Sequence, residues 1–81
     1  MSRMTHVIRR ALIRNGVSLD PFTIMEVETL LAPAIRGQGG VEAAVEYVKT
    51  IFAKSYVDNP EDVARRVIEE VVETCRREGC D

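Results

Sequence analysis

The hydrophobic residues of this chain fall into four stretches with the spacing of an α-helix, and no stretch alternates as a half-exposed β-strand does. The first stretch covers residues 2–15. Its hydrophobic side chains recur every three or four positions, at Met4, Val7, Ile8, Ala11 and Leu12. Asn15 and Gly16 predict the end of this helix, because both residues tolerate left-handed backbone.

The second stretch, residues 20–36, is hydrophobic around most of its circumference. It opens with Asp20 before a proline, a pair that suits the N-cap and first position of a helix. One broad face of this helix carries Ile24, Val27, Leu30, Leu31, Ala34 and Ile35. Phe22, Met25 and Ala32 fall largely outside that face, which leaves only a narrow polar strip. This pattern predicts an interior helix around which the others pack.

Pro33 lies inside the second stretch, where it either bends the helix or divides off a final turn at residues 33–36. A glycine-rich loop follows at residues 37–40. It lacks the spacing of a phosphate-binding loop or a dinucleotide fingerprint, so we interpret it as a connector. The third stretch covers residues 41–56 and carries hydrophobic residues at Val41, Ala44, Val45, Val48, Ile51, Phe52 and Tyr56.

The fourth stretch, residues 58–78, has the clearest helix start in the chain. Asn59 precedes Pro60, and acidic residues follow in the first turn, near the positive end of the helix dipole. Hydrophobic residues cover about half of the circumference. A face this wide predicts that the helix lies in a groove between two neighbours or meets another subunit. We therefore expect a partner interface at Val63, Val67, Ile68, Val71 and Val72.

The pattern predicts a single all-α domain over residues 1–81, in which the helix at residues 20–36 is central. The helices at 41–56 and 58–78 are predicted to form an antiparallel hairpin. With 81 residues, 46% of them hydrophobic and none of them Trp, the core must consist of aliphatic side chains. A chain of this size buries only about 60% of its unfolded surface, so its stability margin is small.

The charges are unevenly distributed. Residues 1–19 contain four arginines and no acid, whereas residues 20–81 contain seven basic and thirteen acidic side chains, for a net charge of −2 overall. This asymmetry indicates either a basic contact surface or a basic helix that lies against acidic neighbours, within one fold or across a dimer. Basic side chains that could contact nucleic-acid phosphates are Arg3, Arg9, Arg10, Arg14 and Arg36. The excess of arginine over lysine is compatible with a thermophilic source.

Two cysteines lie five positions apart near the C-terminus. Inside a continuous helix this spacing is too long for a disulfide, and pairing would require the chain to turn at Gly79 first. We expect Cys75 to be a small core residue and Cys80 to be an exposed free thiol. Two cysteines without a further cluster of ligands do not make a zinc site.

The sequence offers no credible catalytic group, cofactor site or metal site. His6 is the only histidine, and no carboxylate stands at helical spacing from it. The segment at residues 1–16 is rich in arginine, like a transit peptide, but we interpret it as a structural helix of a cytoplasmic protein. No apolar run is long enough to span a membrane.

We therefore expect no enzyme and no small-molecule substrate. The function that the pattern favours is a non-enzymatic protein–protein interaction module or small accessory subunit that associates with itself. The alternative is a nucleic-acid-binding protein that contacts phosphates through its arginine-rich first helix, without reading the bases.

Overall fold

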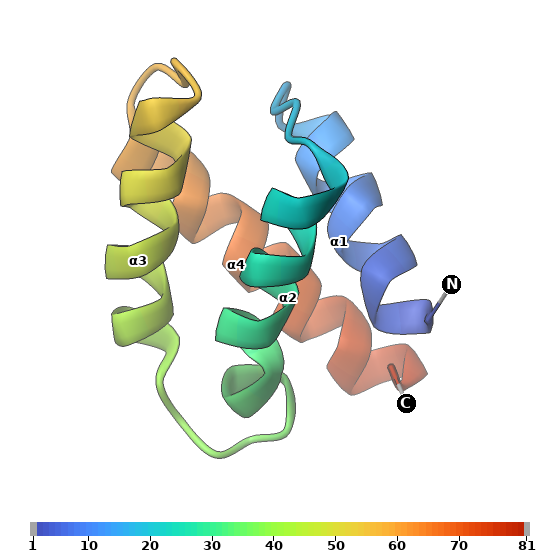
Figure 1. Ribbon diagram of the computed structural model, residues 1–81. Coiled ribbons are helices and arrows are strands. Elements are labelled where there is room, and N and C mark those ends of the chain that lie inside the picture. Colours follow the sequence, from blue (N-terminus) through green and yellow to red (C-terminus); the bar gives the residue numbers. More distant parts are fainter. Residues whose placement is uncertain (1, 81) are drawn as a thin grey trace.

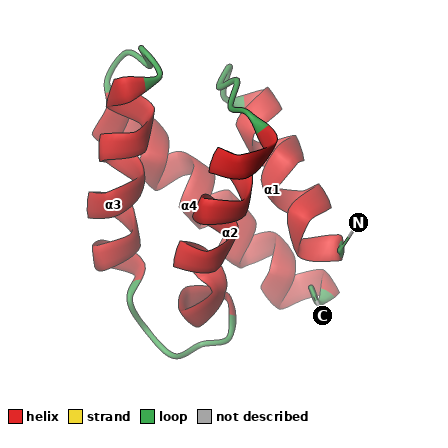
Figure 2. Ribbon diagram, in the orientation of Figure 1, coloured by secondary structure: helices red, strands yellow, loops and turns green. Residues whose placement is uncertain are grey.

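The computed structural model describes residues 2–80, which form four helices and no strand (Figures 1 and 2). The helices are α1 (Arg3–Arg14), α2 (Pro21–Ile35), α3 (Val41–Lys54) and α4 (Pro60–Glu78). The predicted all-α four-helix fold is confirmed. The third helix ends earlier than predicted, and Tyr56 lies beyond it with a positive φ and 94% of its surface exposed.

The longest helix, α4, crosses behind the other three in Figure 1 and packs against each of them. Its most extensive contact is with α3, to which a short loop joins it, so the two form the predicted hairpin. α2 lies between α1 and α3 and also contacts α4. α2 therefore touches every other helix, and so does α4, whose contacts are the more extensive.

The helix starts follow from the sequence. The Ser2 side chain accepts a hydrogen bond from the Thr5 backbone N–H at 3.1 Å, which caps α1. The Asp20 carboxylate caps α2 in the same way, accepting from the Thr23 N–H at 2.9 Å and from the Thr23 hydroxyl at 2.8 Å. Because these bonds favour the ionised form, they lower the pKa of Asp20.

Pro33 does not divide α2, which continues as one helix to Ile35. The proline ring lies on the exposed side of the helix. The Thr29 carbonyl loses its usual N–H donor there, since proline has none, but the carbonyl is on the side that water reaches. Of the two alternatives at Pro33, the structure excludes a separate final turn.

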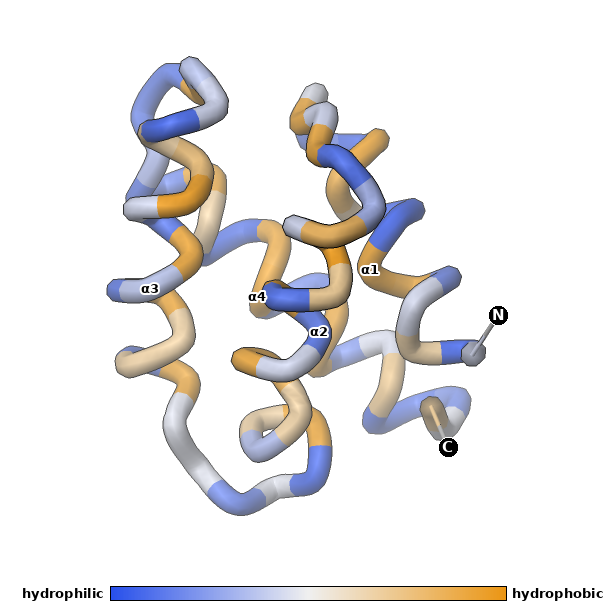
Figure 3. The backbone as a smooth tube through the Cα atoms, in the orientation of Figure 1, coloured by the Kyte–Doolittle hydropathy of each residue, from blue (hydrophilic) through white to orange (hydrophobic). Residues whose placement is uncertain are grey.

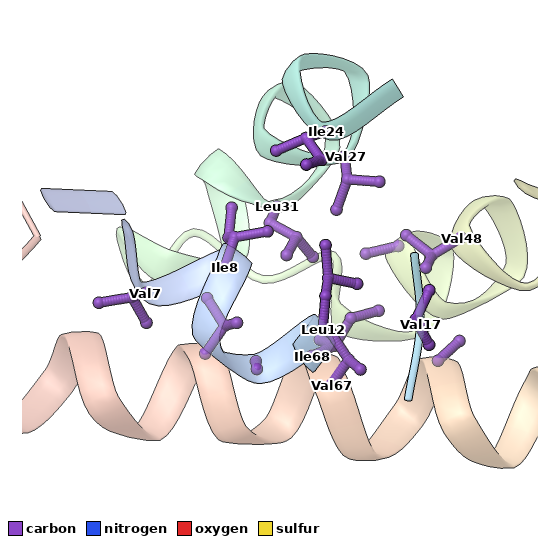
Figure 4. Packing of buried hydrophobic residues seen from close by; sticks show 14 of the residues in the cluster. Val7, Ile8, Leu12, Val17, Ile24, Val27, Leu31, Val48, Val67 and Ile68 are labelled. Carbon is purple, nitrogen blue, oxygen red and sulfur yellow. The ribbon is translucent and has the colours of Figure 1, made fainter. Parts of the chain in front are cut away.

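The core is one cluster to which all four helices contribute. In Figure 4, Ile24, Val27 and Leu31 of α2 point toward α1 and α4. They meet a layer whose labelled members are Ile8, Leu12, Val67 and Ile68. The fully buried side chains are almost all aliphatic, with Phe52 as the one aromatic among them, in line with the composition.

The two cysteines differ from the prediction. Cys75 and Cys80 form a disulfide, with their Cα atoms 5.0 Å apart. α4 ends at Glu78, and Gly79 adopts a φ of 80°, which turns the chain back toward the helix before Cys80. Cys75 is buried as expected, but Cys80 is only 7% exposed and is not a free thiol. The glycine turn that pairing requires is therefore formed.

Candidate protein-contact surface

The residues predicted as a partner interface on α4 lie inside the fold. Val63, Val67, Ile68 and Val71 are buried in the core cluster, and Val72 is partly buried against it. The wide apolar face is covered because α4 packs against three neighbouring helices. This corrects the expectation of a free apolar surface there, since the chain itself supplies the groove in which α4 lies.

Several exposed apolar residues lie instead on α2, while Ile13 of α1 is exposed by itself, at 75%. Phe22 and Met25 are 82% and 62% exposed, and Pro33 is exposed farther along the same side. Ala32, which directly precedes Pro33, is partly exposed. Together with Thr29, these residues form what we call the outer face of α2, opposite the buried Val27 and its neighbours. Figure 3 shows hydrophobic residues along the length of this helix.

The outer face of α2 is a ridge with a groove on each side. The groove toward α1 is lined by Met4 and Met25, among others. The groove toward α3 is lined by Leu30, Tyr47 and Ile51 together with polar and charged residues, among them Glu26 and Lys54. Tyr47 is 62% exposed, while Leu30 and Ile51 are partly buried. Apolar side chains therefore continue from the ridge into both grooves.

The sequence contained a signal for this surface. Phe22, Met25 and Ala32 lie outside the main apolar face of their helix, and this pattern predicts an interior helix with only a narrow polar strip. The structure shows that a helix in this position buries one side only. The sequence pattern therefore identifies these apolar residues but does not predict that they are exposed.

The arginines of α1 do not form one free basic surface. Arg3 pairs with Glu78 of α4 and donates a second hydrogen bond, from Nε, to the Gly79 carbonyl at 3.0 Å. Arg14 pairs with Glu70 of α4 at 3.1 Å. The basic helix thus lies against acidic residues of its own chain, which is one of the two arrangements that the charge pattern indicated.

The other candidate arginines are dispersed. Arg10 borders a small hollow between α1 and α4 that also contains Glu70 and Glu78. Arg9 lies farther around α1, beside the connector to α2, and its Nε is buried without a hydrogen-bond partner. Arg36 follows the end of α2. Within residues 2–80, no ion pair involves these three arginines.

Ion pairs also connect α3 with α4. Both terminal nitrogens of Arg65 bind the Glu42 carboxylate, at 2.7 and 3.1 Å, and these bonds lower the pKa of Glu42 and raise that of Arg65. Lys49 binds Glu46 and Glu61, at 3.0 and 3.2 Å, which raises the pKa of Lys49. These groups lie at the surface, where water reaches them, so each pair contributes little to the free energy of unfolding.

Within residues 2–80, no group of His, Cys, Asp and Glu side chains is arranged to hold a metal ion. In the same part of the chain, no helix combines the length and the apolar character needed to cross a membrane. Comparison with models of known families, with curated proteins and with solved structures gives no match to this chain. The geometry of the surface is therefore the basis for a functional proposal.

Proposed function

We propose that this chain is a non-enzymatic protein–protein interaction module, self-associating or acting as a small accessory subunit, and that its contact surface is the outer face of α2. The observation that supports this is the exposure of Phe22 and Met25 next to Ala32 and Pro33. A single exposed apolar residue needs no explanation, but a row of them bordered by grooves of mixed polar and apolar lining is typical of a contact surface.

The size of the surface predicts weak association. Full burial of a Phe or Met side chain contributes about 1.5–3 kcal/mol, so two such residues from each of two copies contribute roughly 6–12 kcal/mol. Association costs about 4–15 kcal/mol in lost translational, rotational and side-chain freedom. Because the two estimates overlap, we expect a complex that forms at micromolar or higher concentration and depends strongly on both side chains.

Sedimentation equilibrium over a wide concentration range tests the self-associating form. We expect the average mass of the wild type to rise with concentration and that of a Phe22→Ser, Met25→Ser variant to stay at the monomer value. Tyr56→Ser is the matched control, because Tyr56 is more exposed than either residue but lies beyond the end of α3. An unchanged monomer mass for the wild type at the highest concentration would contradict self-association.

The accessory-subunit form needs a test with a foreign partner. A photo-crosslinking amino acid at position 22, introduced in cells of the source organism, should give discrete adducts. The same amino acid at position 56 serves as the control. Equal labelling from both positions would contradict a specific contact at the outer face of α2.

The expected cytoplasmic location, taken together with the disulfide, indicates what kind of organism the protein comes from. Disulfides are rare in the cytosol of mesophiles but occur inside hyperthermophile cells. If the location is cytoplasmic, the Cys75–Cys80 disulfide and the excess of arginine over lysine favour a thermophilic source; a disulfide is equally typical of oxidising compartments outside the cytosol. Thiol trapping of the protein in intact cells of the source organism tests this: oxidised cysteines are expected, and free thiols would contradict it.

Nucleic-acid binding is the second candidate. It is supported by the lack of ion pairs at Arg9, Arg10 and Arg36 among residues 2–80, and it is weakened by the pairing of Arg3 and Arg14 with α4. Binding through phosphates predicts an affinity that falls steeply with salt and with an Arg9→Glu, Arg10→Glu variant. A mobility shift at low salt with duplex and single strands would show a complex, and its absence would eliminate this candidate.

A further inference from the structure

We propose that the partner of the outer face of α2 is a second copy of this chain, and that the two α2 helices pack antiparallel across a two-fold axis at Thr29. This inference rests on the proposed function, because it names the occupant of the same surface. It adds a register, which determines the residues that meet. The support comes from the spacing, the charges and the hydrogen bonds of α2.

Three exposed residues of α2 and its C-cap are evenly spaced along one line. Phe22, Thr29 and Arg36 are seven positions apart, so each lies nearly two helical turns from the next and all three project from the same side. Met25 and Ala32 lie one turn to either side of Thr29. The small Thr29 is thus at the centre, with large residues before it and smaller or charged residues after it.

An antiparallel pair centred on Thr29 brings unlike residues together. Phe22 of one copy is placed opposite Arg36 of the other, which suits a cation–π contact between the ring and the guanidinium. Met25 of one copy is placed beside Ala32 of the other, so a long side chain meets a short one. Because the axis is two-fold, each of these pairs occurs twice.

The charges on α2 favour the same direction. Asp20, Glu26 and Glu28 lie in the first half of the helix or at its N-cap, and Arg36 is the one charged residue between positions 29 and 36. A parallel pair would place acid beside acid at one end. An antiparallel pair places the arginine of each copy near the acidic half of the other and also opposes the two helix dipoles.

Covering the centre of the face leaves no hydrogen-bond donor unpaired, provided that water still reaches the Thr29 carbonyl, which Pro33 leaves without an N–H partner. The Thr29 hydroxyl already bonds to the Met25 carbonyl at 3.1 Å. Pro33, one turn farther on, has no N–H to satisfy. The small side chain at position 29 also allows two helix axes to approach to about 8–10 Å, the usual distance of packed helices.

Crosslinking of introduced cysteines with a short bismaleimide tests the register, under conditions that keep the Cys75–Cys80 disulfide intact. We expect Thr29→Cys to give a covalent dimer, because the same position of both copies meets at the axis. A mixture of Met25→Cys and Ala32→Cys chains should crosslink faster than either variant alone. Glu69→Cys, on the exposed side of α4, is the control and should stay monomeric.

A second measurement concerns the Phe22–Arg36 contact. Cation–π contacts at exposed sites contribute about 0.5–1 kcal/mol, and the dimer contains two. The dissociation constant measured by sedimentation should therefore rise about five- to thirtyfold in Arg36→Gln. A control variant, Arg76→Gln, removes an exposed arginine of α4 and should leave the constant unchanged.

Two results would overturn the antiparallel pair, and they differ in what they mean for the proposed function. If the wild type associates through Phe22 and Met25 but Thr29→Cys crosslinks no faster than Glu69→Cys, the contact surface stands and the register is wrong. If the wild type remains a monomer, a second copy is not the occupant, and the photo-crosslinks from position 22 decide whether a foreign partner is.

Discussion

α2 and α4 both carry more hydrophobic residues than one helix–helix contact can cover, yet only α2 leaves them exposed. α4 concentrates its apolar residues on one wide face, and three neighbouring helices cover that face. α2 has apolar residues on opposite sides, so the side that faces α1, α3 and α4 is buried while Phe22 and Met25 remain in water. The distribution of apolar residues around a helix, and not their number, thus decides whether any are left for a partner.

The largest expected effect is a difference in stability between core and surface substitutions on the two helices. Ile68 of α4 is fully buried, so Ile68→Ala should lower the free energy of unfolding by about 2–5 kcal/mol. Met25→Ala on the outer face of α2 should change it by less than about 0.5 kcal/mol in the monomer. Urea unfolding at low protein concentration measures both. Equal losses would mean that Met25 is part of the packed core.

The next effect concerns the end of α4, where the disulfide links Cys75 to a residue five positions farther on. Closing so short a loop lowers the conformational entropy of the unfolded chain, which raises the free energy of the unfolded state by about 2 kcal/mol. Reduction of the disulfide should therefore lower the free energy of unfolding by about that amount. A Cys75→Ala, Cys80→Ala variant is the control and should not respond to the reductant. A wild type that is equally stable in both redox states would show that the link does not constrain the unfolded chain.

The smallest effect concerns the ion pair between α3 and α4. Because Arg65 lowers the pKa of Glu42 below its ordinary value of 4.5, the pair stabilises the fold above that pH and loses this contribution as the pH falls further. Glu42→Gln should therefore be slightly less stable than the wild type near neutral pH, and the difference should disappear in acid. Thermal unfolding across that pH range checks this. A difference that grows as the pH falls would contradict the assigned direction.

Much of the fold could be predicted from local signals. Periodicity located all four helices, and Asp20, Asn15 with Gly16, and Pro60 marked boundaries within a residue or two of those in the structure. The packing of α3 on α4 followed from the short connection between them. Such signals are reliable because they depend on residues close together in the sequence.

The contact surface could not be predicted in the same way, because exposure depends on how many neighbours a helix has. The pattern of α4 predicted either a groove between neighbouring helices or contact with another subunit, and it did not decide between them; in the structure α1, α2 and α3 cover Val67 and Ile68. The ion pairs show the same limit: Arg65 lies four positions before Glu69, a spacing that favours pairing on one helix, but in the structure it binds Glu42 of α3. The disulfide forms because the chain turns at Gly79, and the spacing of the two cysteines alone does not predict that turn.

The most direct test of the contact surface compares methyl groups of the two helices by nuclear magnetic resonance in a dilution series. Met25 of α2 and Ile68 of α4 each carry a methyl group that reports on its surroundings. If the outer face of α2 is the contact surface of a self-associating chain, the Met25 signal shifts with concentration and the Ile68 signal does not. A stationary Met25 signal while Ile68 and its neighbours on α4 shift would contradict the account.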